Sequence, residues 1–100
     1  MWILSGPGKD SNALTFRLRA GGIKTVGRAP RADFIVDAAL VSRIHCRLEA
    51  GDESVDVIDL SSTNGTYVNG KRVDRARLGA GDRLRVGRVE LKVEKLGPYV

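Results

Sequence analysis

Arginine, hydroxyl and amide side chains that suit anion binding occur in three separate stretches of this 100-residue chain. Arg28 follows a glycine, Ser42 and Arg43 begin the second stretch, and Thr63 and Asn64 lie in the third. The forked guanidinium of arginine matches phosphate oxygens, hydroxyls donate hydrogen bonds, and an asparagine amide both donates to and accepts from a peptide backbone. These residue types predict a site that holds a phosphate and a peptide without making or breaking bonds.

The third stretch is the most distinctive, because residues 61–66 read Ser-Ser-Thr-Asn-Gly-Thr between two β-prone segments. Asn64-Gly65 alone predicts a tight turn, since glycine accepts a positive φ without steric cost. A turn needs only two residues of this kind. The four hydroxyls around it therefore indicate contact with a ligand as well.

Catalytic and metal-binding patterns are absent from the sequence. His45 and Cys46 are the only histidine and cysteine, and neighbours on a strand point to opposite faces, so they do not form a nucleophile–base pair. We expect Cys46 in the core beside Ile44 and Leu48, and His45 on the other face. Structural zinc normally takes four Cys or His ligands, and no phosphate-binding loop or dinucleotide fingerprint is present. We expect no enzyme activity, no metal and no cofactor.

Composition indicates one soluble domain inside the cell. Hydrophobic residues make up 42% of the chain and charged residues 29%, which is ordinary for a globular protein. A single cysteine excludes an internal disulfide bond. The first apolar run has only three residues and no basic leader, and no run reaches the length of a membrane span. We expect a monomeric domain in the cytoplasm, or in the nucleus of a eukaryote, with no membrane partner.

The net charge of +5 comes from the last quarter of the chain. Residues 71–95 contain nine Lys or Arg against four acids, whereas residues 1–70 contain eight of each sign. A basic segment attracts nucleic acid or another anionic partner. Interleaved aromatic residues and a nucleic-acid motif are missing, so we interpret Arg83, Arg85 and Arg88 as solvated. Nucleic-acid binding through 71–95 is the alternative.

Nine short segments alternate apolar and polar residues or are apolar throughout, and Gly or Asn turns separate them. They are residues 2–4, 14–19, 23–26, 33–36, 44–49, 55–60, 67–68, 83–86 and 89–94. Asn69-Gly70 predicts a tight hairpin turn, and the last two segments predict an antiparallel hairpin. Residues 38–40 could form one helical turn. No window sustains an amphipathic helix, so the pattern predicts an all-β sandwich or barrel, whose loops cluster at its ends.

The three stretches, in their order, resemble the signature of the forkhead-associated (FHA) domain. The matching residues are Gly27-Arg28, Ser42-x-x-His45 and Ser62-Thr63-Asn64-Gly65, and the ordered set is far more specific than any one motif. The resemblance extends through the run 59–70 and through the turn 78–84 followed by Val86-Gly87. It covers residues from about Leu14 to Glu94.

The resemblance implies a β-sandwich of about eleven strands, FHA/SMAD-like, with its ligand loops at one end. It implies an FHA domain over 1–96, with 97–100 as a C-terminal tail or the start of a linker. It also implies that the phosphate is contacted by Arg28, Ser42, Arg43 and Thr63. It implies that Asn64 binds the peptide backbone, and that the loops are held in shape by Gly27, His45 and Gly65.

The partner implied by the resemblance is a protein that carries phosphothreonine. It would be the substrate of a Ser/Thr kinase or the kinase itself, recruited in signalling. A phosphothreonine elsewhere in a longer version of this chain is a second possibility. Leu40, two residues before Ser42, suggests an aliphatic preference near the third position after the phosphothreonine.

Overall fold

The computed structural model describes residues 1–8 and 13–97, and eleven β-strands are present in this part of the chain. The strands are β1 (Trp2–Pro7), β2 (Ala13–Leu18), β3 (Ile23–Gly27), β4 (Phe34–Ile35), β5 (Cys46–Ala50), β6 (Val55–Asp59), β7 (Thr66–Val68), β8 (Lys71–Val73), β9 (Arg75–Leu78), β10 (Arg83–Val86) and β11 (Val89–Lys95). Of the predicted tail 97–100, only Gly97 lies within the described residues.

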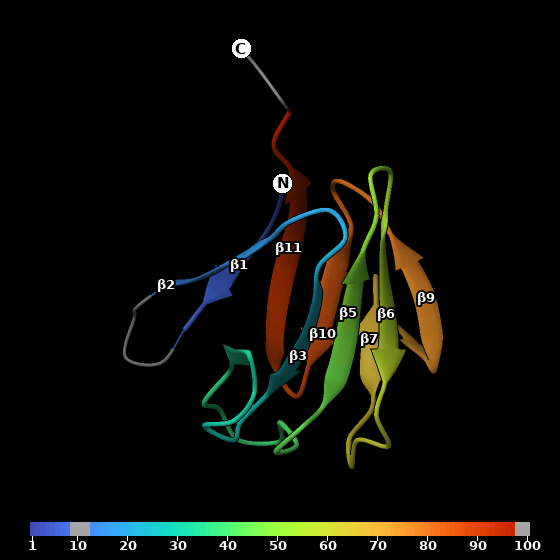
Figure 1. Cartoon of the computed structure of the whole chain (residues 1–100). Helices are drawn as coiled ribbons and strands as arrows, with labels where there is room; N and C mark the ends of the chain where they lie inside the picture. Colours follow the sequence, from blue (N-terminus) through green and yellow to red (C-terminus); the bar gives the residue numbers. More distant parts are fainter. Residues whose placement is uncertain (9–12, 98–100) are drawn as a thin grey trace.

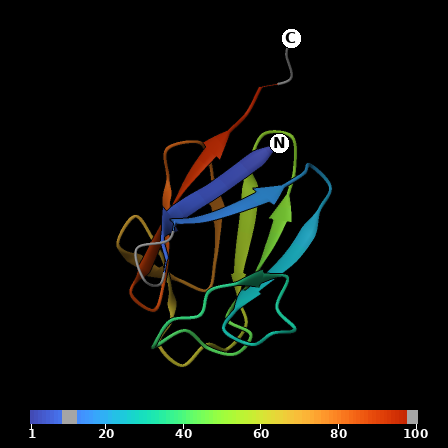
Figure 2. The same cartoon turned by 90° about the vertical axis from the view of Figure 1, so that its left-hand side faces the viewer.

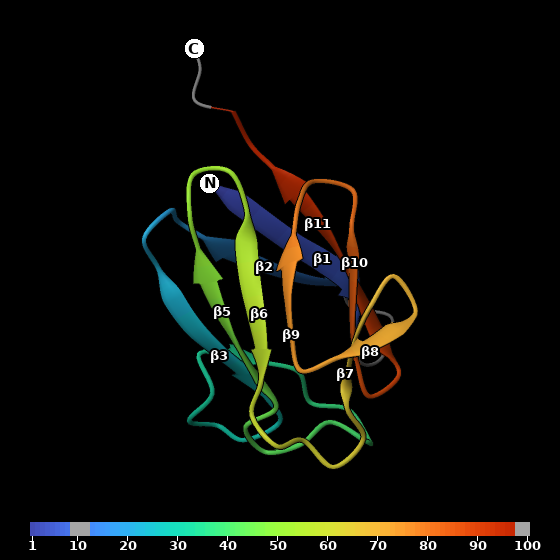
Figure 3. The same ribbon diagram turned by 90° about the vertical axis from the view of Figure 1, so that its right-hand side faces the viewer.

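The strands form two sheets that pack face to face, as Figure 3 shows with β3, β5, β6 and β9 in front. The six-stranded sheet has the order β2-β1-β11-β10-β7-β8, and the five-stranded sheet has the order β4-β3-β5-β6-β9. All pairs are antiparallel except β3 with β4. The chain crosses between the sheets several times, so segments distant in sequence meet at the ends of the sandwich. The predicted all-β sandwich is confirmed.

The core is aliphatic and comes from the inward faces of both sheets. On β5, Cys46, Leu48 and Ala50 are buried while Arg47 and Glu49 are half-buried, which is the period of a strand with one covered face. The indole of Trp2 is buried, and its Nε1–H donates to the carbonyl of Gly51 at 2.9 Å. Within the described residues, no helix is long and apolar enough to cross a membrane.

Two strands, β8 and β9, were not predicted from the sequence. Each lies at the edge of its sheet, where charged side chains protect the unpaired edge and hide the apolar alternation. The hairpin turn between β7 and β8 is confirmed, since Val68 pairs with Lys71 and the two turn residues, Asn69 and Gly70, have φ of 51° and 83°. The predicted β10–β11 hairpin is also confirmed.

The predicted position of His45 on the outer face of a strand is wrong. Strand β5 begins at Cys46, so His45 lies in the loop before it, and its side chain is fully buried. Residues 38–40 form a turn and no helix: the Val41 N–H donates to the Ala38 carbonyl at 3.4 Å, and Leu40 has φ of 71°. A left-handed leucine is uncommon, which marks this loop as held by its surroundings.

Three loops lie together at one end of the sandwich: β3–β4, β4–β5 and β6–β7, at the bottom of Figures 1 and 2. The first and last described residues lie at the opposite end, where the Leu96 N–H donates to the carbonyl of Met1 at 2.8 Å. The loop end is therefore where residues from the three sequence stretches meet.

Candidate functional site

An open hollow of about 540 Å³ lies between the three loops. All five residues predicted to contact a phosphopeptide line it, namely Arg28, Ser42, Arg43, Thr63 and Asn64, together with residues 39–41. They come from the β3–β4, β4–β5 and β6–β7 loops. Residues up to 36 positions apart in sequence thus share one concave surface.

Arg28 is held in place by carbonyl groups and not by an acid. Its backbone N–H donates to the Ser42 carbonyl at 3.0 Å, and its side-chain Nε–H donates to the Val41 carbonyl at 3.1 Å. Among residues 1–8 and 13–97, no carboxylate forms a salt bridge with it. The Nε bond therefore directs its two terminal amino groups. A guanidinium in this state is prepared for a phosphate.

Gly27 allows the loops to approach each other. A Cβ atom at this position would lie 2.1 Å from the carbonyl oxygen of Arg43 and 2.9 Å from the Cα of Ile44. The backbone of β3 thus presses directly against residues 43 and 44, and the Ala29 N–H donates to the Arg43 carbonyl at 3.0 Å. Any larger residue would push the arginine of the first loop away from the serine of the second.

Ser42 and the β6–β7 loop are joined by a hydrogen bond that leaves the serine proton available. The Thr63 N–H donates to Ser42 Oγ at 3.0 Å, so the oxygen accepts and the hydroxyl hydrogen is still free to donate. Asn64 is fixed in a similar way, because its Nδ2 donates to the Leu40 carbonyl at 3.1 Å. Its side-chain oxygen then remains as an acceptor for a peptide N–H.

His45 connects the second and third loops from below. The Ser42 N–H donates to Nδ1 at 3.0 Å, and Nε2 lies 2.8 Å from the carbonyl oxygen of Gly65. Because Nδ1 accepts, the ring hydrogen is on Nε2, which donates to that carbonyl. The buried ring replaces two backbone partners that these loops lack. Its position supports a structural role beneath the hollow.

Asp59 anchors the third loop and was not singled out from the sequence. Its carboxylate accepts from the Ser62 hydroxyl at 2.5 Å, the Ser62 N–H at 3.1 Å and the Thr66 hydroxyl at 2.7 Å. Burial opposes ionisation of Asp59, but these hydrogen bonds and nearby His45 together hold its pKa below the usual value. The signal was an acid three residues before a serine, a pattern typical of side chains that close turns.

Gly65 completes this loop, with φ of 89° and an N–H that donates to Ser62 Oγ at 3.0 Å. A side chain here would be strained by the positive φ and would meet the Arg72 side chain at 2.8 Å.

Cys46 is a core residue: burial and then the charge of Asp59 raise the pKa of its thiol to about 12. The thiol is therefore protonated and unreactive at neutral pH.

Comparison with known families matches residues 24–87 to the model described as the FHA domain. Glycogen accumulation regulator GarA of Mycobacterium tuberculosis is 39% identical over 69 residues, which are 69% of this chain and 43% of GarA. The oxoglutarate dehydrogenase inhibitor of Corynebacterium diphtheriae is 39% identical over 67 residues, 67% of this chain and 47% of that protein. This chain thus spans less than half the length of these curated relatives.

Solved structures match nearly the whole chain. The FHA domain of CT664 from Chlamydia trachomatis has a TM-score of 0.88 at 26% identity, with 96% of this chain and 98% of that chain covered. The FhaA FHA domain, solved with the intracellular domain of Rv3910, has a TM-score of 0.82 at 32% identity, with 94% and 100% covered. A structure from a study of phosphothreonine-dependent FHA domain interactions has a TM-score of 0.81 at 29% identity, with 97% and 98% covered.

Proposed function

The chain belongs to the FHA domain family, and we propose that the hollow at its loop end is where it binds phosphothreonine. As a member of this family it is a phosphothreonine-dependent binding module and not an enzyme. One observation carries the assignment of the site. The guanidinium of Arg28 and the hydroxyl groups of Ser42 and Thr63 line the same hollow, although they lie in three different loops.

The phosphate group is bound by charge and hydrogen bonds together. A phosphothreonine carries about −1.5 to −2 charge near neutral pH and three acceptor oxygens. Arg28 supplies the positive charge through its terminal amino groups, and Arg43 adds a second cation on the same rim. The Ser42 hydroxyl donates its free hydrogen and Thr63 donates another. Because the loops are already joined to each other, little ordering is needed on binding.

The peptide backbone is read by Asn64, whose oxygen accepts an N–H from a residue beside the phosphothreonine. The amide is fixed by its bond to the Leu40 carbonyl, so this oxygen has a defined direction. Gly27, His45 and Gly65 position the loops without touching the ligand. In this scheme the phosphate gives affinity, and the asparagine fixes the path of the peptide across the loops.

The partner is a protein phosphorylated on threonine, either a substrate of a Ser/Thr kinase or the kinase itself. Support comes from the similarity to the FhaA FHA domain, which was solved with the intracellular domain of Rv3910. The proposal places the domain in the cytoplasm, where such kinases find ATP. Regulation of an enzyme, as the name of the oxoglutarate dehydrogenase inhibitor describes for that protein, is one use of such binding.

The test is a titration of three versions of one peptide, with Thr, phosphoserine or phosphothreonine at the same position. The peptide is first selected from a library with a fixed phosphothreonine. We expect saturable binding of the phosphothreonine version, weaker binding of the phosphoserine version and no measurable binding of the Thr version by isothermal titration calorimetry. Equal binding of the Thr and phosphothreonine versions would contradict the proposal.

A further inference from the structure

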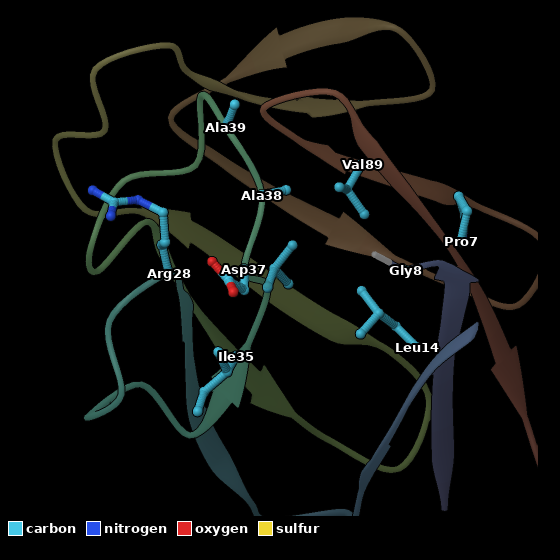
Figure 4. Close-up of a pocket in the computed structure, with 10 residues that line it drawn as sticks. Pro7, Gly8, Leu14, Arg28, Ile35, Asp37, Ala38, Ala39 and Val89 are labelled. Atoms are coloured by element: carbon cyan, nitrogen blue, oxygen red, sulfur yellow. The ribbon is translucent and has the colours of Figure 1, made fainter. Parts of the chain in front are cut away.

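An apolar groove of about 560 Å³ lies beside the phosphate hollow and has no part in the function described above. Its walls include the aliphatic side chains of Leu14, Ile35 and Val89, with Ala38 and Ala39 between them, and the charged residues Arg28 and Asp37 also line it. Figure 4 shows these side chains around the groove, with Arg28 at one end and Pro7 at the other. A groove of this size falls within the range of pockets that hold small ligands or peptide side chains.

The groove and the phosphate hollow are continuous. Arg28 and Ala39 line both of them, whereas Leu40 lines only the phosphate hollow and not the groove. A peptide whose phosphate reaches Arg28 therefore passes over Ala39 when it leaves the hollow on this side. The groove is a separate surface from the one that Leu40 provides.

Three parts of the fold build the groove. Ile35 belongs to the edge strand β4, Leu14 pairs with Gly6 across β1 and β2, and Val89 begins β11 after the turn at Gly87. A Cβ on Gly87 would lie 3.0 Å from the carbonyl carbon of Leu40. The β10–β11 turn thus packs against the loop that forms the other wall.

Ile35 is 42% exposed at this groove, and a large aliphatic side chain in water beside a cationic site needs a reason. Contiguous exposed apolar surface next to polar groups is typical of interaction sites. The continuity of the groove with the phosphate hollow favours the phosphorylated partner over a second copy of this chain.

We propose that this groove binds an aliphatic side chain of the same partner whose phosphothreonine occupies the hollow at Arg28. This inference rests on the proposed function and adds a second point of recognition to it. The phosphate distinguishes modified from unmodified threonine, and the groove selects among phosphothreonine sites by a neighbouring Ile, Leu or Val. Burial of one such side chain contributes about tenfold in affinity.

The experiment uses a peptide library with a fixed phosphothreonine and degenerate positions on both sides, screened with three proteins. These are the wild-type chain, Ile35→Ser in the groove and the matched control Ile23→Ser. Ile23 lies on the neighbouring strand β3, is 61% exposed and does not line the groove. We expect enrichment of Ile, Leu or Val at one position with the wild type and the control, and loss of that enrichment with Ile35→Ser.

A double-mutant cycle then measures the coupling by fluorescence anisotropy, with the selected peptide and its aliphatic-to-Ser version. The peptide change should weaken binding to the wild type about tenfold and to Ile35→Ser less than about twofold. Leu14→Ser, in the opposite wall, repeats the test independently of any local effect at Ile35. Both variants should still bind the phosphothreonine peptide, since neither residue touches the phosphate hollow.

Three outcomes would overturn the groove proposal while the proposed function stands. One is retention of phosphopeptides without aliphatic enrichment, the second is enrichment that survives both groove variants, and the third is a peptide aliphatic-to-Ser change that weakens binding to the groove variants as much as to the wild type. A dimer seen by light scattering and abolished by Ile35→Ser would assign the groove to a second copy and also overturn it. If the wild type retains no phosphopeptide at all, the proposed function itself is wrong, and the groove proposal falls with it.

Discussion

The two groups of cations in this molecule differ in what surrounds them. In the basic segment 71–95, most cations face an acid or an aromatic ring. The contacts are Arg75 and Arg77 with Asp56, at 3.1 and 3.6 Å, Arg83 with Glu90 at 3.2 Å, Lys92 with Glu94 at 3.4 Å, and Arg85 over the ring of Tyr67 at 3.9 Å. At the loop end, Arg28 and Arg43 form no salt bridge within the described residues, and the Nε–H of Arg28 donates to a carbonyl.

The number of charges in a segment of the sequence therefore does not predict where the anion-binding site lies. The basic segment supplies the whole net charge, yet its strands belong to both sheets, since β9 lies in one and β10 and β11 in the other. A cation held by neutral groups keeps its full charge for a ligand, whereas a surface ion pair contributes little to either stability or binding.

Replacing Arg28 should have the largest effect. Arg28→Ala leaves the phosphate without its forked partner, so affinity for a phosphothreonine peptide should fall by about 2–5 kcal/mol. Arg75→Ala is the matched control, because that arginine is paired with Asp56 and does not line the hollow. Calorimetric titration of both variants gives the comparison. Wild-type affinity in Arg28→Ala would refute the assignment of the phosphate hollow.

Removing the Ser42 hydroxyl should cost less. Ser42→Ala deletes one donor to the phosphate and the acceptor for the Thr63 N–H, so affinity should fall by about 1–3 kcal/mol. The same titration measures it. Thermal unfolding of the free protein separates the two losses, because only the bond to Thr63 is present without ligand. Unchanged affinity would show that the serine only closes the loop.

Asp59 should affect stability, and at neutral pH more than in acid. Its pKa is lowered in the folded state, so its contribution is complete above the unfolded value of about 3.9 and disappears as the pH falls through the folded value. Asp59→Asn should reduce the free energy of unfolding by about 1–2 kcal/mol at pH 7. Urea unfolding at pH 7 and below pH 4 should show the two proteins converging in acid; a constant difference would contradict this account.

Reversing three cations of the basic segment should change phosphopeptide affinity least. In the triple variant Arg83→Glu, Arg85→Glu and Arg88→Glu, affinity should stay within about 0.5 kcal/mol of wild type, since these side chains lie outside the hollow. A single-stranded DNA oligonucleotide in the same assay tests the alternative. Tight DNA binding at physiological salt that the triple variant abolishes would favour nucleic acid as the ligand of this segment.

The fold was predictable where strands have one buried face. The alternation in 44–49 and 89–94 and the Asn69-Gly70 turn depend on local patterns, and the structure has strands at Cys46–Ala50 and Val89–Lys95 and the turn at Asn69-Gly70. Strands β8 and β9 were not predicted, because edge strands carry charged side chains that protect the unpaired edge and hide the apolar alternation. The predicted position of His45 was wrong because the strand pattern was extended two residues too far, into the loop before β5. In that loop the buried ring forms hydrogen bonds with the Ser42 N–H and the Gly65 carbonyl.

The site was predictable in its residues but not in its supports. Arg28, Ser42, Arg43, Thr63 and Asn64 line one hollow, as their types and order in the sequence led us to expect. The three hydrogen bonds to Asp59 join residues near in sequence and had a local signal, a carboxylate three residues before Ser62. The bonds of Arg28 to the Val41 carbonyl and of Asn64 to the Leu40 carbonyl were not predictable, since backbone carbonyls are present at every position and only the fold selects them.

The first and last described residues lie away from the loops, which limits how this domain could recognise a threonine on a longer version of its own polypeptide. The molecule is 39 Å in its longest dimension, and an extended chain covers at most about 3.3–3.6 Å per residue. A tether that runs the full length of the molecule would therefore need roughly eleven or more residues. A threonine nearer to either end would be within reach only of another molecule, so tether length decides between self-capture and recruitment.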